Sequence, residues 1–96
     1  MTRPALSDFV SREGQWFQAR HLEEKVMRRW KLEAIKTFDA PDEEVLRELD
    51  CFMLTFKHED AEILPQGLHH LISEDGFETT LFATPFQNNE MIITIN

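Results

Sequence analysis

The C-terminal stretch FETTLFATPFQNNEMIITIN, residues 77–96, decides the fold class that the sequence predicts. Its segments 77–85 and 90–95 are rich in Thr, Ile and Phe and alternate apolar with polar residues, which is typical of β-strands. The residues QNN between them predict a turn in which Asn88 or Asn89 adopts a positive φ angle. We therefore expect a C-terminal antiparallel β-hairpin.

The alternation also assigns the side chains of this hairpin to two faces. One face carries Phe77, Leu81, Ala83, Met91, Ile93 and Ile95, and the other carries Phe82, Phe86 and Ile92. If helices cover the first face, the second exposes three large apolar side chains, and such patches mark interfaces. The alternatives are that both faces are buried within this chain, or that a bulge turns Phe86 inward.

Upstream of the hairpin, the spacing of apolar residues predicts helices, so the expected fold class is α+β. A helical stretch over about 8–36, interrupted near Gly14, rests on apolar residues that recur every three or four positions: Trp16, Ala19, Leu22, Val26, Trp30 and Ala34. Further helices are predicted over about 41–57 and 64–73, the latter closed by Gly76. Segments 30–36 and 51–57 can also be interpreted as strands, and both assignments stay open.

The acidic run DAPDEEVLRELD, residues 39–50, begins the second of these helices. Asp39 is a good N-cap, and acidic residues in the first turn interact favourably with the helix dipole. Capping does not account for Glu48 and Asp50, which are left for water or a partner. We therefore predict a partner-binding acidic surface built from Asp42, Glu43, Glu44, Glu48 and Asp50.

Size and charge set the broad class of the protein. Its 96 residues predict a single domain, 1–96, and its net charge is −8. Residues 1–38 carry eight Lys or Arg and five Asp or Glu, whereas residues 39–96 carry two and thirteen. The sequence shows no apolar run long enough for a membrane span, no secretory signal and a single cysteine, Cys51. We expect a cytoplasmic protein without membrane contact.

No motif in the sequence predicts catalysis, a metal or a cofactor. Cys51 lies between apolar residues and beside Asp50, so we interpret it as a buried structural thiol. His58, Glu59 and Asp60 stand together, with His69 and His70 further on, but their spacing on a helix does not converge on a metal ion. We interpret these histidines as solvated or capping residues. We therefore expect a protein that is not an enzyme.

The basic stretch RHLEEKVMRRWK, residues 20–31, raises the alternative of nucleic-acid binding. On a helix Lys25, Arg28 and Arg29 would share a face, with Arg20 near its margin. Acidic residues interrupt this stretch, and the acidic remainder of the chain would repel phosphates. The sequence therefore disfavours nucleic acid as the partner.

The functional hypothesis is a small acidic protein that binds a basic partner protein, of the inhibitor, immunity, anti-defence or chaperone type. The acidic surface would speed association, and Phe82, Phe86 and Ile92 would supply apolar anchors. Two alternatives stay open: a nucleic-acid-associated regulator that uses Arg20, Lys25, Arg28 and Arg29, and a structural subunit of a homo-oligomer such as a homodimer, whose hairpin completes a larger sheet.

Overall fold

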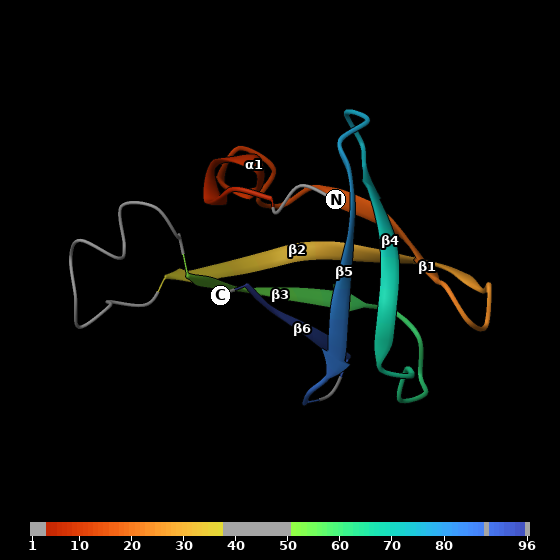
Figure 1. Ribbon diagram of the computed structural model, residues 1–96. Helices are drawn as coiled ribbons and strands as arrows, with labels where there is room; N and C mark the ends of the chain where they lie inside the picture. The colour runs from red at the N-terminus through yellow and green to blue at the C-terminus, as the bar shows by residue number, and fades with distance from the viewer. Residues whose placement is uncertain (1–3, 38–50, 88, 96) are drawn as a thin grey trace.

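The computed structural model describes residues 4–37, 51–87 and 89–95, which form one short helix and six strands (Figure 1). The elements, in chain order, are α1 (Leu6–Val10), β1 (Trp16–His21), β2 (Met27–Thr37), β3 (Phe52–His58), β4 (Gly67–Ser73), β5 (Glu78–Pro85) and β6 (Glu90–Ile95). The strands close into a barrel in the order β1-β2-β3-β6-β5-β4, and every neighbouring pair is antiparallel.

The barrel consists of two halves that are consecutive in sequence. Strands β1, β2 and β3 pair in order, and so do β4, β5 and β6. Two further ladders join the halves: β1 pairs with β4 from Phe17↔Ser73 to His21↔His69, and β3 pairs with β6 from Phe52↔Ile95 to Lys57↔Glu90.

The expected α+β class, with helices over about 8–36 and 64–73, is therefore wrong. Residues four apart share a face in both a helix and a regular strand, so a four-residue spacing of apolar residues does not distinguish the two. In β2 a register shift between Leu32 and Ala34 leaves Ala34 exposed, although Trp30 is buried. Phe17 and Leu32 lie off the helical stripe, yet both are buried, because strand alternation turns them into the barrel. Segment 64–73 contains β4, in which Leu68 is exposed and His69 is buried.

The helix expected over 41–57 is wrong where the structure describes it. Residues 51–57 belong almost entirely to β3, so the strand interpretation is confirmed here, as it is for residues 30–36 in β2. Residues 38–50 lie outside the described residues. The hairpin over 77–85 and 90–95 is present as β5 and β6, and Asn89 has the positive φ angle expected in its turn, 62°.

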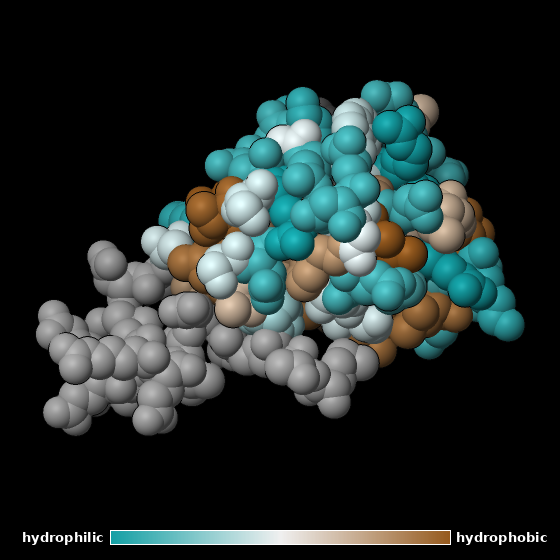
Figure 2. All heavy atoms as spheres, turned by 90° about the horizontal axis from the view of Figure 1, so that it is seen from above, coloured by the Kyte–Doolittle hydropathy of each residue, from teal (hydrophilic) through white to brown (hydrophobic). Residues whose placement is uncertain are grey.

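The interior of the barrel is filled by side chains from alternate positions of all six strands. It contains Phe17, Ala19, Trp30, Leu32, Phe52, Leu54, Phe56, Leu71, Ala83, Met91, Ile93 and Ile95. The Phe17 and Phe56 rings meet edge to face with centroids 5.3 Å apart, a favourable arrangement for aromatic pairs. In the face shown in Figure 2, hydrophilic residues dominate and hydrophobic residues reach the surface in separate patches.

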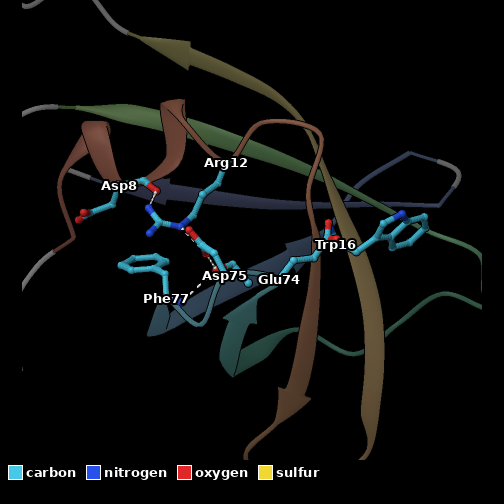
Figure 3. A network of polar contacts seen from close by, with 7 residues as sticks. Asp8, Arg12, Trp16, Glu74, Asp75 and Phe77 are labelled. Carbon is cyan, nitrogen blue, oxygen red and sulfur yellow. Dashed lines mark hydrogen bonds and ion pairs between the residues drawn. The ribbon is translucent and has the colours of Figure 1, made fainter.

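Helix α1 covers one end of the barrel, which we call the helix end. Its Phe9 is completely buried and packs against Phe52 and Phe77, with ring centroids 5.8 and 5.6 Å away. Arg12 fixes the helix to the β4–β5 turn, because its Nε donates to Asp75 Oδ1 at 3.0 Å and its guanidinium lies over the Phe77 ring (Figure 3). Arg12 also donates to the Asp8 carbonyl, so the network joins both elements (Figure 3).

Buried polar residues line the opposite end of the barrel, which we call the histidine end. His21 Nδ1 accepts from the backbone N–H groups of Glu23 and Glu24, at 3.2 and 3.1 Å, and its Nε2 donates to the Gln66 carbonyl at 3.0 Å. His21 thereby joins the β1–β2 turn to the segment before β4. Residues 59–66 connect β3 to β4 at this end, and the side chain of Leu64, within this segment, is buried.

Among the described residues, no helix is long and apolar enough to cross a membrane.

Candidate functional site

An apolar groove lies on the outside of the barrel, over β3, β6 and β5. Alternation buries Leu54, Ala83 and Ile93 in the interior and therefore turns their chain neighbours outward. The groove has a volume of about 350 Å³ and is lined by Met53, Phe82, Thr84, Pro85, Phe86, Ile92 and Thr94. No lining residue is charged, so the groove suits an apolar side chain.

Two aromatic rings dominate this apolar groove. Phe82 is 53% exposed and Phe86 is 61% exposed, although Phe residues are usually buried. Leu68 of β4 stands directly opposite Phe82 and is also half exposed. Phe82, Leu68 and Leu22 line an adjoining hollow of about 340 Å³, so the apolar surface continues across β5 and β4. A contiguous exposed apolar surface of this kind makes the groove the candidate binding site.

An acidic hollow continues the apolar groove at the histidine end. The two share Pro85 and Phe86, and Glu62 and Glu90 contribute carboxylates to the hollow. Its volume is about 160 Å³. Residues 51–95 of the sequence contain one lysine and seven acidic residues, so the surroundings are acidic as well. A partner that fits both sites would present apolar anchors beside positive charge.

Burial lowers the pKa of two histidines at the histidine end, His58 and His69. His69 Nδ1 donates to the Gly67 carbonyl at 2.9 Å, and its ring lies 4.6 Å from Trp30 and 4.8 Å from His21 between centroids. Burial is the largest effect and lowers the pKa of His69, although its hydrogen bond to the Gly67 carbonyl acts in the opposite direction. Burial also lowers the pKa of His58, although the Asp60 carboxylate, 3.8 Å away, acts in the opposite direction. Both shifts favour the neutral form of the ring.

Several buried polar atoms at the histidine end have no hydrogen-bond partner among the described residues: Arg28 Nη1, Trp30 Nε1, His58 Nδ1 and His69 Nε2. Buried groups of this kind are ordinarily satisfied by internal water. The described residues contain no group of three or more His, Cys, Asp or Glu that could hold a metal ion.

The interpretation of the histidines as solvated or capping is correct for only some of them. His70 lies on the outside of β4, where its Nε2 is 3.5 Å from Glu78 Oε1. His69 points the other way and is completely buried. A strand separates adjacent residues onto opposite faces, whereas the helix expected here would have placed them only about 100° apart.

The basic residues do not form the single face that a helix would give. Arg20 and Arg29 lie on the outside of β1 and β2, and the Arg29 guanidinium stacks 4.7 Å from the centroid of the Trp16 ring. Arg28 is instead directed to the histidine end, where its Nη2 lies 4.0 Å from Glu62 Oε1. Lys25 lies in the β1–β2 turn with a φ angle of 58°.

The structure brings the three apolar residues predicted from the sequence together, since Phe82, Phe86 and Ile92 all line the apolar groove. The possibility that both hairpin faces are buried is therefore wrong. The predicted acidic residues Asp42, Glu43, Glu44, Glu48 and Asp50 lie outside the described residues. Sequence reasoning missed Met53, because a helix was favoured there, and Leu68, whose outward position follows from alternation in β4.

Comparison with known proteins identifies one family. A family model described as "Domain of unknown function (DUF6916)" matches residues 4–94 of the chain. Neither the curated proteins nor the solved structures contain a match.

Proposed function

Since the chain belongs to the DUF6916 family, for which no function is described, we propose from the site that the protein binds a partner protein and is not an enzyme. The observation that carries this proposal is the exposed apolar groove, which continues into the acidic hollow at Pro85 and Phe86. The site is a surface for recognition: its groove offers apolar side chains and its hollow adds carboxylates at one end.

The aromatic residues of the groove supply the affinity. Phe82 and Phe86 keep more than half of their surface in water, so a partner that covers them gains the free energy of burying two large apolar side chains. Aromatic side chains at the centre of an interface commonly dominate its binding energy. Removing either ring should therefore weaken binding much more than removing an exposed apolar residue elsewhere.

The carboxylates select the charge of the partner. Glu62 and Glu90 line the hollow beside Phe86, and the chain as a whole carries a net charge of −8. A field of this sign attracts basic proteins, speeds their association and repels acidic ones. The proposed partner is therefore a basic protein with apolar side chains next to Lys or Arg.

The biological roles that suit this recognition are those of an inhibitor, an immunity protein, an anti-defence protein or a chaperone. All four bind a partner without chemistry of their own, and each can use acidic charge to neutralise a basic target. The single cysteine of the chain agrees with a cytoplasmic site of action, which we include in the proposal.

A second candidate function is nucleic-acid binding through positively charged side chains on β1, β2 and β3. Lys31 and Lys57 stand directly opposite each other on β2 and β3, and Glu90 of β6 stands opposite Lys57 on its other side. Arg29 and the Trp16 ring lie near them on the same surface. This candidate uses Arg20, Arg29, Lys31 and Lys57 in place of the helical set that the sequence predicted.

The proposed function is tested with peptides selected for binding to the wild-type protein from a random displayed library. We expect the selected peptides to combine aromatic or aliphatic residues with Lys or Arg. The substitution Phe82→Asp should weaken their binding by about 2 kcal/mol or more, because it removes an anchor and adds a charge to the groove. Titration calorimetry measures the difference.

Met27→Asp is the matched control, because Met27 is 52% exposed but lies away from the groove, on the β1–β2 hairpin. It should leave peptide binding nearly unchanged. Equal losses for Phe82→Asp and Met27→Asp, or no loss for Phe82→Asp, would show that the groove is not the binding site.

A further inference from the structure

A histidine lines the acidic hollow, and its position deepens the proposed function by indicating how binding is regulated. His58 is the last residue of β3 and lines the hollow together with Glu62 and Glu90. It is 6% exposed, and its Nδ1 atom has no hydrogen-bond partner among the described residues. A proton on this ring therefore adds a positive charge to the surface that is proposed to receive Lys or Arg of the partner.

Neighbouring strands fix the position of His58. Alternation along β3 turns its side chain to the interior, as it does for Leu54 and Phe56. The His58 N–H donates to the Asn89 carbonyl at 3.0 Å, and the Asn89 side chain donates to the His58 carbonyl at 3.0 Å. Asn89 also lines the hollow, so His58 is tied to the turn between β5 and β6 that forms part of its wall.

Charged groups from β2, β3, β6 and the segment after β3 surround the hollow. Asp60 Oδ2 lies 3.8 Å from His58 Nδ1, and Arg28 Nη2 lies 4.0 Å from Glu62 Oε1. Lys57 stands opposite Glu90 on the paired strands. The described contacts and ladders thus place three carboxylates and two cations at the hollow: Asp60, Glu62, Glu90, Arg28 and Lys57.

This set has one more negative charge than positive charges while His58 is neutral. A proton on His58 cancels that excess, so the hollow no longer attracts a cation. A basic side chain of the partner would also meet a like charge at the wall of the hollow, which is unfavourable. The protonation state of one ring therefore decides whether the hollow favours a Lys or Arg.

We propose that protonation of His58 releases the basic partner, so that the acidic hollow binds a Lys or Arg side chain only while this ring is neutral. The coupling is reciprocal: a proton weakens binding of the partner, and the bound partner makes His58 harder to protonate. The inference rests on the proposed function, because it requires a basic group of the partner in the hollow.

The pH range of this release follows from the surroundings of His58. Burial lowers the pKa of His58, the Asp60 carboxylate opposes this shift, and the charge of Arg28 adds to it. The ring therefore gains its proton below its ordinary pKa of about 6.5. Affinity should be constant above about pH 6.5 and fall below it in proportion to the neutral fraction of His58.

The test uses a library-selected peptide that contains Lys or Arg but no His, Asp or Glu, with both of its ends blocked. The charge of such a peptide stays constant between about pH 7.5 and about pH 5. Fluorescence anisotropy measures its Kd across this range, and circular dichroism establishes that the protein is folded at each pH. The Kd of the wild-type protein should rise about threefold or more from the upper to the lower pH.

Two variants assign this change to His58. His58→Gln keeps a polar side chain but cannot gain a proton, so its Kd should stay nearly constant over the range. His70→Gln is the matched control, because His70 lies on the outside of β4, where its Nε2 is 3.5 Å from Glu78 Oε1, and does not line the hollow. It should keep the pH dependence of the wild-type protein.

A second measurement uses the wild-type protein alone, in case His58→Gln does not fold. Nuclear magnetic resonance follows the Cε1–H signals of the histidines during a pH titration, with and without saturating peptide. The peptide should lower the pKa of His58 and leave that of His70 unchanged, because only His58 lines the hollow.

The same pH dependence in His58→Gln and in the wild-type protein would overturn the inference, and so would a wild-type Kd that stays constant down to about pH 5. Loss of the dependence in His70→Gln, or a pKa of His58 that the peptide does not change, would also overturn it. If Phe82→Asp still weakens binding of the same peptide at about pH 7.5, the proposed function survives and only the regulation by His58 fails.

Discussion

Gly67 shows how a single residue closes the histidine end of the barrel. A Cβ atom at this position would lie 2.8 Å from His21 Nε2, which is closer than such atoms approach, and the φ angle of Gly67 is +144°. His21 Nε2 is the atom that donates to the Gln66 carbonyl, so the close approach and the hydrogen bond belong to one arrangement.

We expect Gly67→Ala to destabilise the protein through both strain and collision. Gly76→Ala is the control, because its φ angle is +93° but nothing lies within 4 Å of its added Cβ. Backbone strain alone should cost Gly76→Ala about 1–2 kcal/mol, and Gly67→Ala should cost more. Urea unfolding measures both, and a smaller loss for Gly67→Ala would contradict the role assigned to this contact.

The residues that could be predicted from the sequence are those whose position depends on local alternation. Phe82, Phe86 and Ile92 were assigned to one face because a strand fixes side-chain parity over neighbouring residues. Met53 and Glu62 could not be joined to them, since their proximity depends on the β3–β6 ladder and the path of residues 59–66. Neither residue can be assigned to the site from the sequence, because the register between the strands is not known at that stage.

Helix α1 is the element that closes the helix end, and its five residues are too few to be stable alone. Its stability comes from Phe9, buried against Phe52 and Phe77, and from the contact of Arg12 with Asp75. The side-chain contacts of Phe9 and Arg12, rather than helix propensity, therefore hold α1 in place.

We expect Phe9→Ala to lower the free energy of unfolding by about 3–5 kcal/mol, because it leaves a cavity where a buried ring was. Val10→Ala, at a position that is 57% exposed, should change it by less than about 0.5 kcal/mol. Urea denaturation followed by circular dichroism distinguishes the two. A loss below about 1 kcal/mol for Phe9→Ala would show that α1 does not close the barrel.

Among the elements, the C-terminal hairpin was predictable and the upstream strands were not. Period-2 alternation is clear in β5 and β6, whereas in β1 and β2 apolar residues also recur at helical spacing. The interior positions Phe17, Leu32 and Leu71 become understandable only when six strands bury them together. Tertiary burial therefore overrides a local pattern that fits a helix.

The stability of the whole molecule should depend on pH in two separate ranges. Burial holds the pKa of His69 and of His58 below their ordinary value of about 6.5, so the unfolded chain binds these protons more readily. The free energy of unfolding should therefore be highest above about pH 6.5 and fall as the pH decreases below it. Hydrogen bonds from Ser73 and Arg12 lower the pKa of Asp75 to about 2, so its contribution is lost from about pH 3.8 down to 2.

Urea unfolding at a series of pH values measures both ranges. His69→Gln with His58→Gln should flatten the decrease just below pH 6.5, whereas Asp75→Asn should leave it in place and affect only the more acidic range. An unchanged slope below pH 6.5 in the double histidine variant would contradict the assignment of these groups.

The strands of the barrel form two groups that are consecutive in the chain. Strands β1–β3 and β4–β6 each form a continuous meander, and residues 59–66 alone connect them along the chain. The β1–β4 and β3–β6 ladders join the two groups. These ladders can pair strands of one chain or strands of two fragments. We therefore expect that a chain cleaved between Ala61 and Glu62 keeps its two fragments together, which size-exclusion chromatography of the cleaved protein would show.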